Sequence, residues 1–338
     1  VETAYELGYD AIGIADVNSM AGVVRIHAEA RALKLRPVIG CRIETVEGLT
    51  FLAYPQDRAA YGRLCALISA GRMGTLDGEW QDKGVCEISL AMLAARGEGV
   101  HLVLVPPRDL EERFTIAVES NVVALGGEGA QAPALRERTG TLDKLLPDLA
   151  AHLPGLGHIA ACYLHVGDDV ARIAQLDALA RGAGLSLLAT NDVLYHAPER
   201  RPLHDVMTAI RHRTTVARAG LALEPNGERH LKSPAEMERL FARWPHAIHA
   251  ARDLADACTF SLEELQYEYP EEICPGGRDP QAQLELLTWE GAAQRYPEGT
   301  PEAVDATLHR ELALIGKMGL ARYFLTIKDI VDFARGQE

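Results

Sequence analysis

The sequence has 338 residues, 48% of them hydrophobic, and a formal net charge of -14. A chain of this length can bury a sizeable core in one large or two ordinary domains. No apolar run approaches the roughly eighteen residues of a membrane span, and the first residues lack the layout of a signal peptide. The six cysteines include no C-x-x-C pair, which argues against a zinc knuckle or a redox pair. We expect a cytoplasmic globular protein with reduced thiols and no membrane contact.

Strand and helix patterns alternate along the first 200 residues. Buried strands are predicted at 11–16, 36–44, 49–55, 100–107, 157–166 and 185–192, and amphipathic helices at 21–35, 59–71 and 168–184. This alternation predicts an α/β fold with parallel strands and helical crossovers, either as a closed barrel or as an open doubly wound sheet.

The remaining sequence predicts mainly helices. Ser233-Pro234-Ala235-Glu236 is a capping box, and Asp279-Pro280 and Thr300-Pro301 are further helix starts. Two more helices are predicted at 302–318 and 322–335. The stretch 267–280 is rich in Pro, Gly and acidic residues, which is typical of a linker. We therefore predict two domains, 1–268 and 269–338.

One predicted strand leads into polar residues. In the run LLATNDVLYH (187–196), apolar residues deliver Asn191 and Asp192 to the carboxyl end of a strand, where α/β proteins commonly place their sites. An Asp-x-His sequence would put two metal ligands on one face of the strand. The second of these positions is Leu194, so the sequence leaves open whether a metal binds here.

Three stretches resemble, in order, the N-terminal region of the bacterial C-family DNA polymerases, relatives of the polymerase III alpha subunit. They read ATNDVLYHAPERRPLHDVMTAIRHRTTV, NGERHLKSPAEMERLF and HRELALIGKMGLARYFLTIKDIVDFARGQE. The stretches IGIADVNSMAGVVRIHAEA and NDVLYHAPERRPL are most similar to the error-prone, translesion branch. The resemblance implies a PHP (polymerase and histidinol phosphatase) domain, a distorted β/α barrel, followed by the mainly helical opening segment of the polymerase palm. It also implies truncation at both ends, with the first barrel strand missing.

The same resemblance locates the PHP metal ligands. The family's Thr-Asp-His aligns with Ala15-Asp16-Val17, and an acidic ligand of the next strand falls at about Arg42. The final Asp-x-His becomes Asp192-x-Leu194, so Asp192 alone remains as a vestigial metal ligand.

A hydrolytic metal site needs several His and carboxylate ligands to lower the pKa of a bound water. The resemblance therefore implies a catalytically degenerate, structural PHP domain. We expect Arg42 to form a salt bridge with Asp192 or another acid. We expect Asp16, Thr190 and Asn191 to serve as hydrogen-bonding residues at strand ends and loops.

The implied activity is that of an error-prone DNA polymerase, a nucleotidyltransferase of DNA replication and translesion repair. Its catalytic carboxylates follow a Gly-Ser motif beyond this sequence, so no catalytic residue or cofactor is expected here, and Mg²⁺ belongs to the complete polymerase. The implied partners are primer-template DNA, the sliding clamp and mutasome accessory proteins. The alternative is a metal-dependent PHP phosphoesterase, either a proofreading 3'-5' exonuclease or a histidinol-phosphatase-like enzyme.

A basic segment stands out in this acidic chain. Residues 199–218 contain five arginines and two acids. Arg200, Arg201, Arg211 and Arg213 are candidate contacts with a DNA backbone or with the rest of the polymerase, although such a charge run is also typical of a solvated helix face. Farther on, we interpret Tyr323 and Phe324 as core residues rather than as base-stacking residues.

Overall fold

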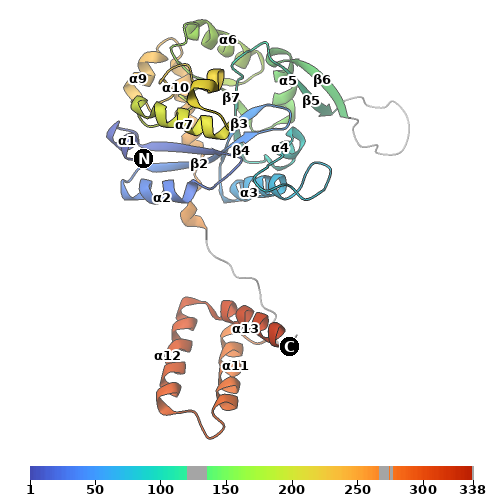
Figure 1. Cartoon of the computed structure of the whole chain (residues 1–338), viewed down its shortest axis with the longest axis vertical. Helices are drawn as coiled ribbons and strands as arrows, with labels where there is room; N and C mark the ends of the chain where they lie inside the picture. The colour runs from blue at the N-terminus through green and yellow to red at the C-terminus, as the bar shows by residue number, and fades with distance from the viewer. Residues whose placement is uncertain (120–134, 266–273, 275–276, 337–338) are drawn as a thin grey trace, which may run out of the picture. The chain divides into compact units, whose positions relative to one another are not determined.

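The computed structural model describes residues 1–119, 135–265, 274 and 277–336. It contains two compact units, Val1–Leu265 and Gln266–Glu338, which are drawn in Figure 1. The predicted domain boundary near residue 268 lies outside the described residues, so that division stays a prediction. In the part of the chain that the structure describes, no helix is both long and apolar enough to cross a bilayer.

A six-stranded sheet forms the centre of the first unit, which confirms the predicted α/β class (Figure 1). Its strands, in spatial order, are β1 (Ala11–Val17), β2 (Arg36–Glu44), β3 (Thr50–Pro55), β4 (Val100–Val105), β7 (Leu156–Ala161) and β8 (Ser186–Ala189). Among the described strands, β1 and β8 form the two edges, so the sheet is open rather than a closed barrel.

The prediction that all strands run parallel is wrong for β3. The pairs β1/β2, β4/β7 and β7/β8 are parallel, but β3 is antiparallel to both β2 and β4. The reason lies in the short link between β2 and β3, a tight turn in which Gly48 has a φ of 85°. A parallel crossover needs a dozen or more residues, so this link permits only a hairpin.

Helices cover the sheet on both faces. In the first unit they are α1 (Glu2–Glu6), α2 (Val23–Ala32), α3 (Arg58–Met73), α4 (Leu90–Arg96), α5 (Leu142–His152), α6 (Asp169–Gly182), α7 (Arg201–Arg211), α8 (Val216–Ala219), α9 (Pro234–Leu240) and α10 (Pro245–Ala257). A separate antiparallel pair, β5 (Arg113–Glu119) and β6 (Leu135–Thr141), packs beside α5 and extends outward from it (Figure 1). The three helices predicted before residue 185 correspond to α2, α3 and α6.

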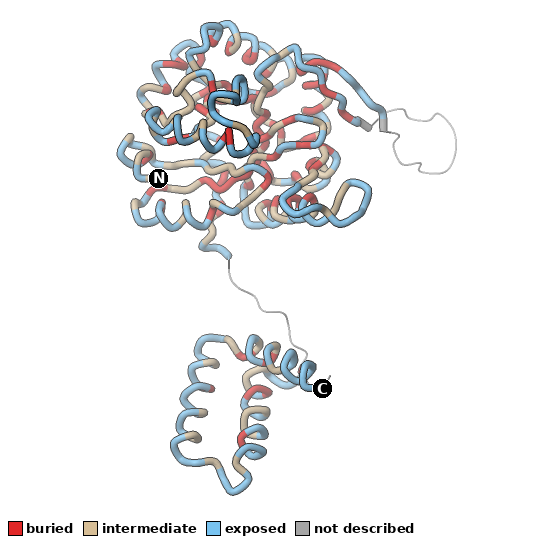
Figure 2. Tube along the Cα trace, viewed as in Figure 1, coloured by how far each residue is buried: buried red, intermediate tan, exposed pale blue. Residues whose placement is uncertain are grey.

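The core follows from the alternation of side chains along the strands. Leu102 and Leu104 of β4 point to one face, into a cluster with residues of α3, α5 and α6. Val103 points to the other face, where it packs with Leu254 of α10. Burial on both faces explains why these strands read as continuous apolar runs, and Figure 2 shows the buried residues along them.

The second unit consists of α11 (Pro280–Arg295), α12 (Glu302–Met318) and α13 (Ala321–Arg335). Leu284, Leu312 and Leu325, one from each helix, meet in a small core. Tyr323 and Phe324 are well exposed within the described part of the chain, so the interpretation of these two rings as core residues is wrong. The α13 face that turns inward is instead the one that carries Leu325.

Candidate functional site

The carboxyl ends of β1 and β2 bring two of the family's ligand positions side by side. In the parallel register of these strands, Val17 pairs with Arg42. After β8 ends at Ala189, the chain places Asp192 and then Leu194 in the following loop. Val17 is 49% and Leu194 38% exposed. Two apolar side chains and one cation therefore stand where the resemblance would require metal ligands.

Asp192 is held by two arginines. Arg42 Nη1 donates to Asp192 Oδ1 at 2.8 Å, and Arg229 Nη2 donates to Asp192 Oδ2. All three side chains are largely buried. The predicted salt bridge between Arg42 and Asp192 is thus confirmed, and Arg229 adds a second one. Both oxygens of the carboxylate are engaged by guanidinium groups.

The ion pairs continue on both sides of this centre. Arg229 Nη1 lies 2.9 Å from Glu224 Oε1, and Arg108 Nη2 lies 2.7 Å from Glu224 Oε2. Toward the other end, Arg42 Nε lies 3.7 Å from a carboxylate oxygen of Glu44. Charges of opposite sign alternate along this arginine-acid network, so each buried charge has a compensating neighbour.

Sequence reasoning missed Arg229, Glu224 and Arg108 as members of the network. Arg229 lies 37 positions after Asp192 in a loop, and Arg108 lies 116 positions before Glu224. A periodicity or a short motif cannot relate residues at such separations. The one available signal is that Arg229 falls within the stretch NGERHLKSPAEMERLF, which carries part of the family resemblance.

The residues present do not fit a PHP metal centre. A divalent cation at Asp192 would have to displace a guanidinium and would then lie next to Arg42 and Arg229. Two unit charges about 4 Å apart near a protein surface interact by roughly 4 kcal/mol, which is repulsive for like signs. Among the described residues, no group of three or more His, Cys, Asp or Glu side chains could hold a metal ion.

A cavity of about 510 Å³ lies beside the network, with Arg42, Asp192 and Arg229 in its wall. Cys162 also lines it. Burial raises the pKa of the Cys162 thiol to about 12, and nearby Asp192 adds to the shift. A thiol with this pKa stays protonated at neutral pH and is a poor nucleophile or metal ligand. Among the described residues that line this cavity, Cys162 is the cysteine, and it is not activated.

The polar residues at the strand ends make hydrogen bonds, as predicted. Thr190 Oγ1 accepts from the Asp192 amide at 3.1 Å, and Asp16 Oδ2 accepts from the Gly22 amide at 2.7 Å. Asn191 Nδ2 donates to the carbonyl oxygens of Glu228, at 2.7 Å, and His230. These contacts position the backbone around Asp192.

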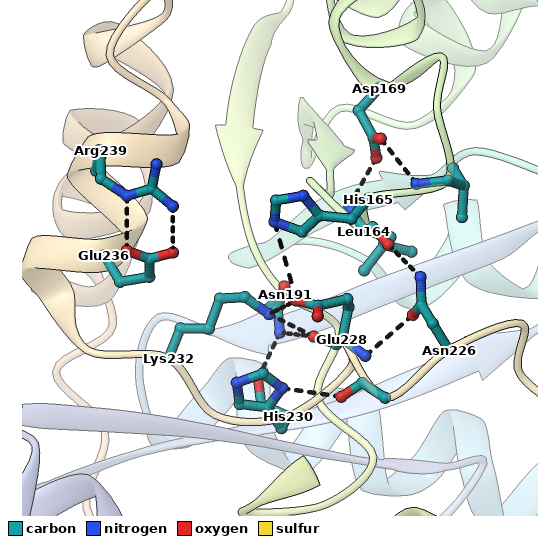
Figure 3. Close-up of polar contacts among 12 residues, drawn as sticks. Leu164, His165, Asp169, Asn191, Asn226, Glu228, His230, Lys232, Glu236 and Arg239 are labelled. Atoms are coloured by element: carbon teal, nitrogen blue, oxygen red, sulfur yellow. Dashed lines mark hydrogen bonds and ion pairs between the residues drawn. The ribbon is translucent and has the colours of Figure 1, made fainter.

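The loop that contains Arg229 is fixed to the strand ends by the contacts drawn in Figure 3. Asn226 Nδ2 donates to the carbonyl oxygen of Leu164 at 2.6 Å. The buried Lys232 ammonium lies 3.1 Å from the Glu228 carboxylate and also donates to the Glu228 carbonyl oxygen. Because the loop is held at several points, Arg229 is presented to Asp192 in a defined position.

The arginines of the basic segment do not share one environment. Arg201 turns inward, where its Nη2 donates to the Glu224 carbonyl oxygen at 2.7 Å and its Nε lies 3.7 Å from Asp205. Arg200, Arg211 and Arg213 are exposed. Three of the four candidate contact residues thus reach the surface, while Arg201 is joined to the arginine-acid network.

Two family models match the chain. The PHP domain matches residues 1–121, and the bacterial DNA polymerase III alpha NTPase domain matches residues 282–338. Among solved structures, a putative metal-dependent phosphoesterase from Bifidobacterium adolescentis overlaps 57% of this chain and 80% of its own, with 15% identity and a TM-score of 0.36.

Curated relatives match over the whole length. The chain is 42% identical over 342 residues to an error-prone DNA polymerase of Bradyrhizobium diazoefficiens, which covers 100% of this chain and 27% of that protein. For the error-prone DNA polymerase of Caulobacter vibrioides the identity is 38%, with 98% of this chain and 28% of that protein covered. The chain thus spans less than a third of the length of these relatives. It is homologous to the bacterial error-prone DNA polymerases and corresponds to their N-terminal PHP and early polymerase region.

Proposed function

We propose that the PHP unit is a non-catalytic, structural domain of an error-prone DNA polymerase that acts in DNA replication and translesion repair. The observation that carries the proposal is the double arginine contact to Asp192. Arg42 and Arg229 neutralise the one acid left in a ligand position and join β2, the loop after β8 and the loop at 226–232. In this proposal, ion pairs do the cross-linking that metal ions would do in a hydrolytic relative.

The proposal assigns residues 1–268 to the PHP-like domain and 269–338 to the opening segment of the palm. Nucleotidyl transfer and its Mg²⁺ ions would then be the task of palm carboxylates outside this part, which needs no cofactor of its own. Primer-template DNA, the sliding clamp and mutasome accessory proteins are the proposed partners, and the cytoplasm is the proposed compartment. Arg200, Arg211 and Arg213, which are exposed, are candidates for contact with the DNA backbone or with other polymerase domains.

Metal content tests the proposal directly. The purified chain would be loaded with Zn²⁺ or Mn²⁺, desalted and analysed by mass spectrometry, in parallel with Asp192→Ala and with an exposed control, Asp77→Ala. We expect all three proteins to retain the same background level, because the arginines occupy the Asp192 oxygens.

The opposite result would be one or more ions retained by the unmodified chain and by Asp77→Ala, but lost from Asp192→Ala. Asp192 would then be a functional ligand. That outcome would favour the phosphoesterase alternative, and hydrolysis of single-stranded DNA ends and of small phosphate monoesters should then be assayed with the metal-loaded protein.

A further inference from the structure

The polar side of helix α7 faces the interior of the first unit. Arg201, Asp205 and Thr208 lie on the inward side, where Thr208 is buried and the Arg201 and Asp205 side chains form an ion pair. His204 belongs to the same side, with its ring 5.9 Å from that of Tyr195. A helix on the surface of a globular protein normally buries its apolar stripe and exposes its polar one. In α7 this arrangement is reversed.

The apolar side of α7 therefore faces outward. Leu203, Val206, Met207 and Ile210 are 56%, 45%, 55% and 70% exposed. They follow a spacing of three and four residues, so they lie on one face of the helix, and we call them the α7 stripe. The helix can be located on the surface of the first unit in Figures 1 and 2. Exposed apolar side chains scattered singly are common, but an aligned row of four is typical of a binding surface.

The surroundings of the α7 stripe are basic. Arg200 precedes the helix, Arg211 ends it, and Arg213 and Arg218 follow in the next turns, all exposed. None of these four guanidinium groups forms an ion pair with a carboxylate of the described residues. The two acids within residues 199–218 are Glu199 and Asp205, and Asp205 turns inward to Arg201. The whole chain has a net charge of -14, so this positive surface is a local exception. Interfaces pair surfaces of opposite charge, which favours an acidic partner here.

The chemistry of the stripe distinguishes between possible occupants. Single-stranded nucleic acid binds where cations are combined with aromatic rings on which bases stack, and the stripe has only aliphatic side chains. A second copy of this chain would bring the same positive rim against its own. The stripe lies on a helix of eleven residues, which is about 16 Å long. A contact of this length alone would bury less than the roughly 1,000 Å² of surface that a stable dimer of folded subunits buries.

We propose that the α7 stripe is a docking site for an amphipathic helix of another protein, one with an aliphatic face flanked by Asp and Glu. Its aliphatic residues would pack between Leu203, Met207 and Ile210, and its acids would meet Arg211 and Arg213. Helices commonly bind in this way, through anchors spaced by three and four residues. The inference goes beyond the structural role proposed for the PHP unit and holds whether or not the first unit binds a metal.

The test uses designed peptides as probes. A fluorescent helical peptide with Leu at positions i, i+3, i+4 and i+7 and Glu on both flanks would be compared with one in which every Glu is replaced by Lys. Binding to the full 338-residue chain would be measured by fluorescence anisotropy at low and at high salt. We expect the acidic peptide to bind at least about tenfold more tightly than the basic one, because the charge term changes sign.

Variants locate the binding to α7. Val206→Glu/Ile210→Glu should weaken binding of the acidic peptide at least about tenfold by placing acids within the stripe, and Arg211→Glu/Arg213→Glu should weaken it and remove its salt dependence. Val24→Glu on α2, where the side chain is 68% exposed, is the matched control and should leave binding unchanged. Circular dichroism melting of each variant separates loss of the site from loss of the fold.

Four outcomes would overturn the proposal. Equal binding of the acidic and basic peptides, or binding that Val206→Glu/Ile210→Glu does not weaken, would remove α7 as the docking site. Binding of an oligo-dT strand that depends on Arg211 and Arg213, without peptide binding, would make this a nucleic-acid surface. A concentration-dependent dimer in sedimentation velocity that Val206→Glu/Ile210→Glu abolishes would make it a contact between two copies of the chain.

Discussion

Arg229 holds both the main chain and the side chain of Asp192. Its Nε donates to the Asp192 carbonyl oxygen at 2.9 Å, and its Nη2 donates to the carboxylate. The backbone at Asp192 has a φ of 40°, a left-handed conformation that is unfavourable for most residues other than Gly, Asn and Asp. The same guanidinium therefore neutralises the acid and fixes the loop conformation that presents it.

Removing one arginine should destabilise the first unit because it leaves one oxygen of the Asp192 carboxylate without its partner. For Arg229→Met and for Arg42→Met we expect a loss of about 1–3 kcal/mol in the free energy of unfolding, the cost of leaving a largely buried acceptor without a hydrogen bond. Urea denaturation followed by circular dichroism measures this. Arg31→Met is the control, since the Arg31–Glu263 pair is mostly exposed and should contribute little.

The triple replacement Arg42→Met/Asp192→Asn/Arg229→Met tests the reason for that loss. If the loss comes from the carboxylate oxygen left without a partner, replacing the carboxylate and both guanidinium groups together should recover much of the stability that each single variant loses. A triple variant less stable than the sum of its single changes would contradict this account and would mean that the contacts act mainly by packing.

Restoring ligands at the family's metal-ligand positions should create metal binding only when both guanidinium groups that occupy Asp192 are also removed. Leu194→His alone should retain no Zn²⁺ after desalting, because Arg42 and Arg229 still occupy Asp192. Val17→His/Arg42→Glu/Leu194→His/Arg229→Met should retain Zn²⁺, because both guanidinium groups that occupy Asp192 are then absent. Positions 17 and 42 are neighbours in the strand register and would supply a nitrogen and an oxygen ligand. Mass spectrometry of the desalted proteins measures the difference.

The control for this reconstruction is a triple variant with ligand residues at exposed positions elsewhere, Val24→His/Glu29→His/Val166→His. It should bind no more Zn²⁺ than the unmodified chain. Retention of Zn²⁺ by Leu194→His alone would mean that Arg42 and Arg229 do not block metal binding at Asp192.

Features that depend on local chemistry could be predicted from the sequence. The N-caps at Ser233 and Asp279 formed, with Ser233 Oγ accepting from the Glu236 amide at 3.2 Å and Asp279 accepting from the Gln281 amide at 3.0 Å. The predicted capping box is only half present, because the Glu236 carboxylate pairs with Arg239. A strand leading to Asp192 was also predicted, because a short apolar run that ends in polar residues indicates one. The predicted end at residue 192 was three residues too late, since β8 ends at Ala189. The start near Thr300 was placed one residue early, because Pro301 is the N-cap.

Features that depend on neighbours distant in the sequence could not be predicted in this way. The hydrophobic pattern identifies which α7 residues share a face, but the Arg201–Asp205 pair and the Glu224 carbonyl decide that the polar face turns inward. Likewise, Arg42 was found through its position in a family motif, whereas Arg229 reaches Asp192 only through the fold of its loop. The short link between β2 and β3 indicated that β3 runs antiparallel to β2. The prediction instead followed the alternation of strands and helices elsewhere in the chain, which favours parallel strands.

Two histidines beneath α10 should make the first unit sensitive to acid. His101 and His158 project from β4 and β7, and burial lowers the pKa of each below the usual 6.5. Below about pH 6.5 the unfolded chain therefore binds more protons than the folded one at these positions, so stability should fall as the pH decreases through that value. Above it both forms are neutral and the effect disappears.

Urea denaturation at about pH 7.5 and about pH 5.5 measures this loss. His101→Gln/His158→Gln should lose less stability between the two conditions than the unmodified chain, because glutamine does not titrate. An exposed substitution, His196→Gln, should leave the difference unchanged. An equal drop in the double variant would assign the acid sensitivity to other groups.

Two glycines at the start of β7 should respond in opposite ways to the same substitution. A Cβ at Gly155 would overlap the backbone carbonyl oxygen of Val100, whereas a Cβ at Gly157 meets nothing within 4 Å. The Leu102 amide also donates to the Gly155 carbonyl oxygen at 2.7 Å, next to the register shift between β4 and β7. Here β4 and the start of β7 approach so closely that only glycine fits at residue 155.

We therefore expect Gly155→Ala to lower the free energy of unfolding by about 1–3 kcal/mol, since the backbone must shift to admit the methyl group. Gly157→Ala should raise it slightly, by up to about 1 kcal/mol, because alanine reduces the freedom of the unfolded chain without a clash. Thermal and urea unfolding of the two variants provide the comparison. Equal effects of the two substitutions would show that β4 and β7 do not meet in the register described, and the placement of Asp192 at the end of the neighbouring β8 would then need revision.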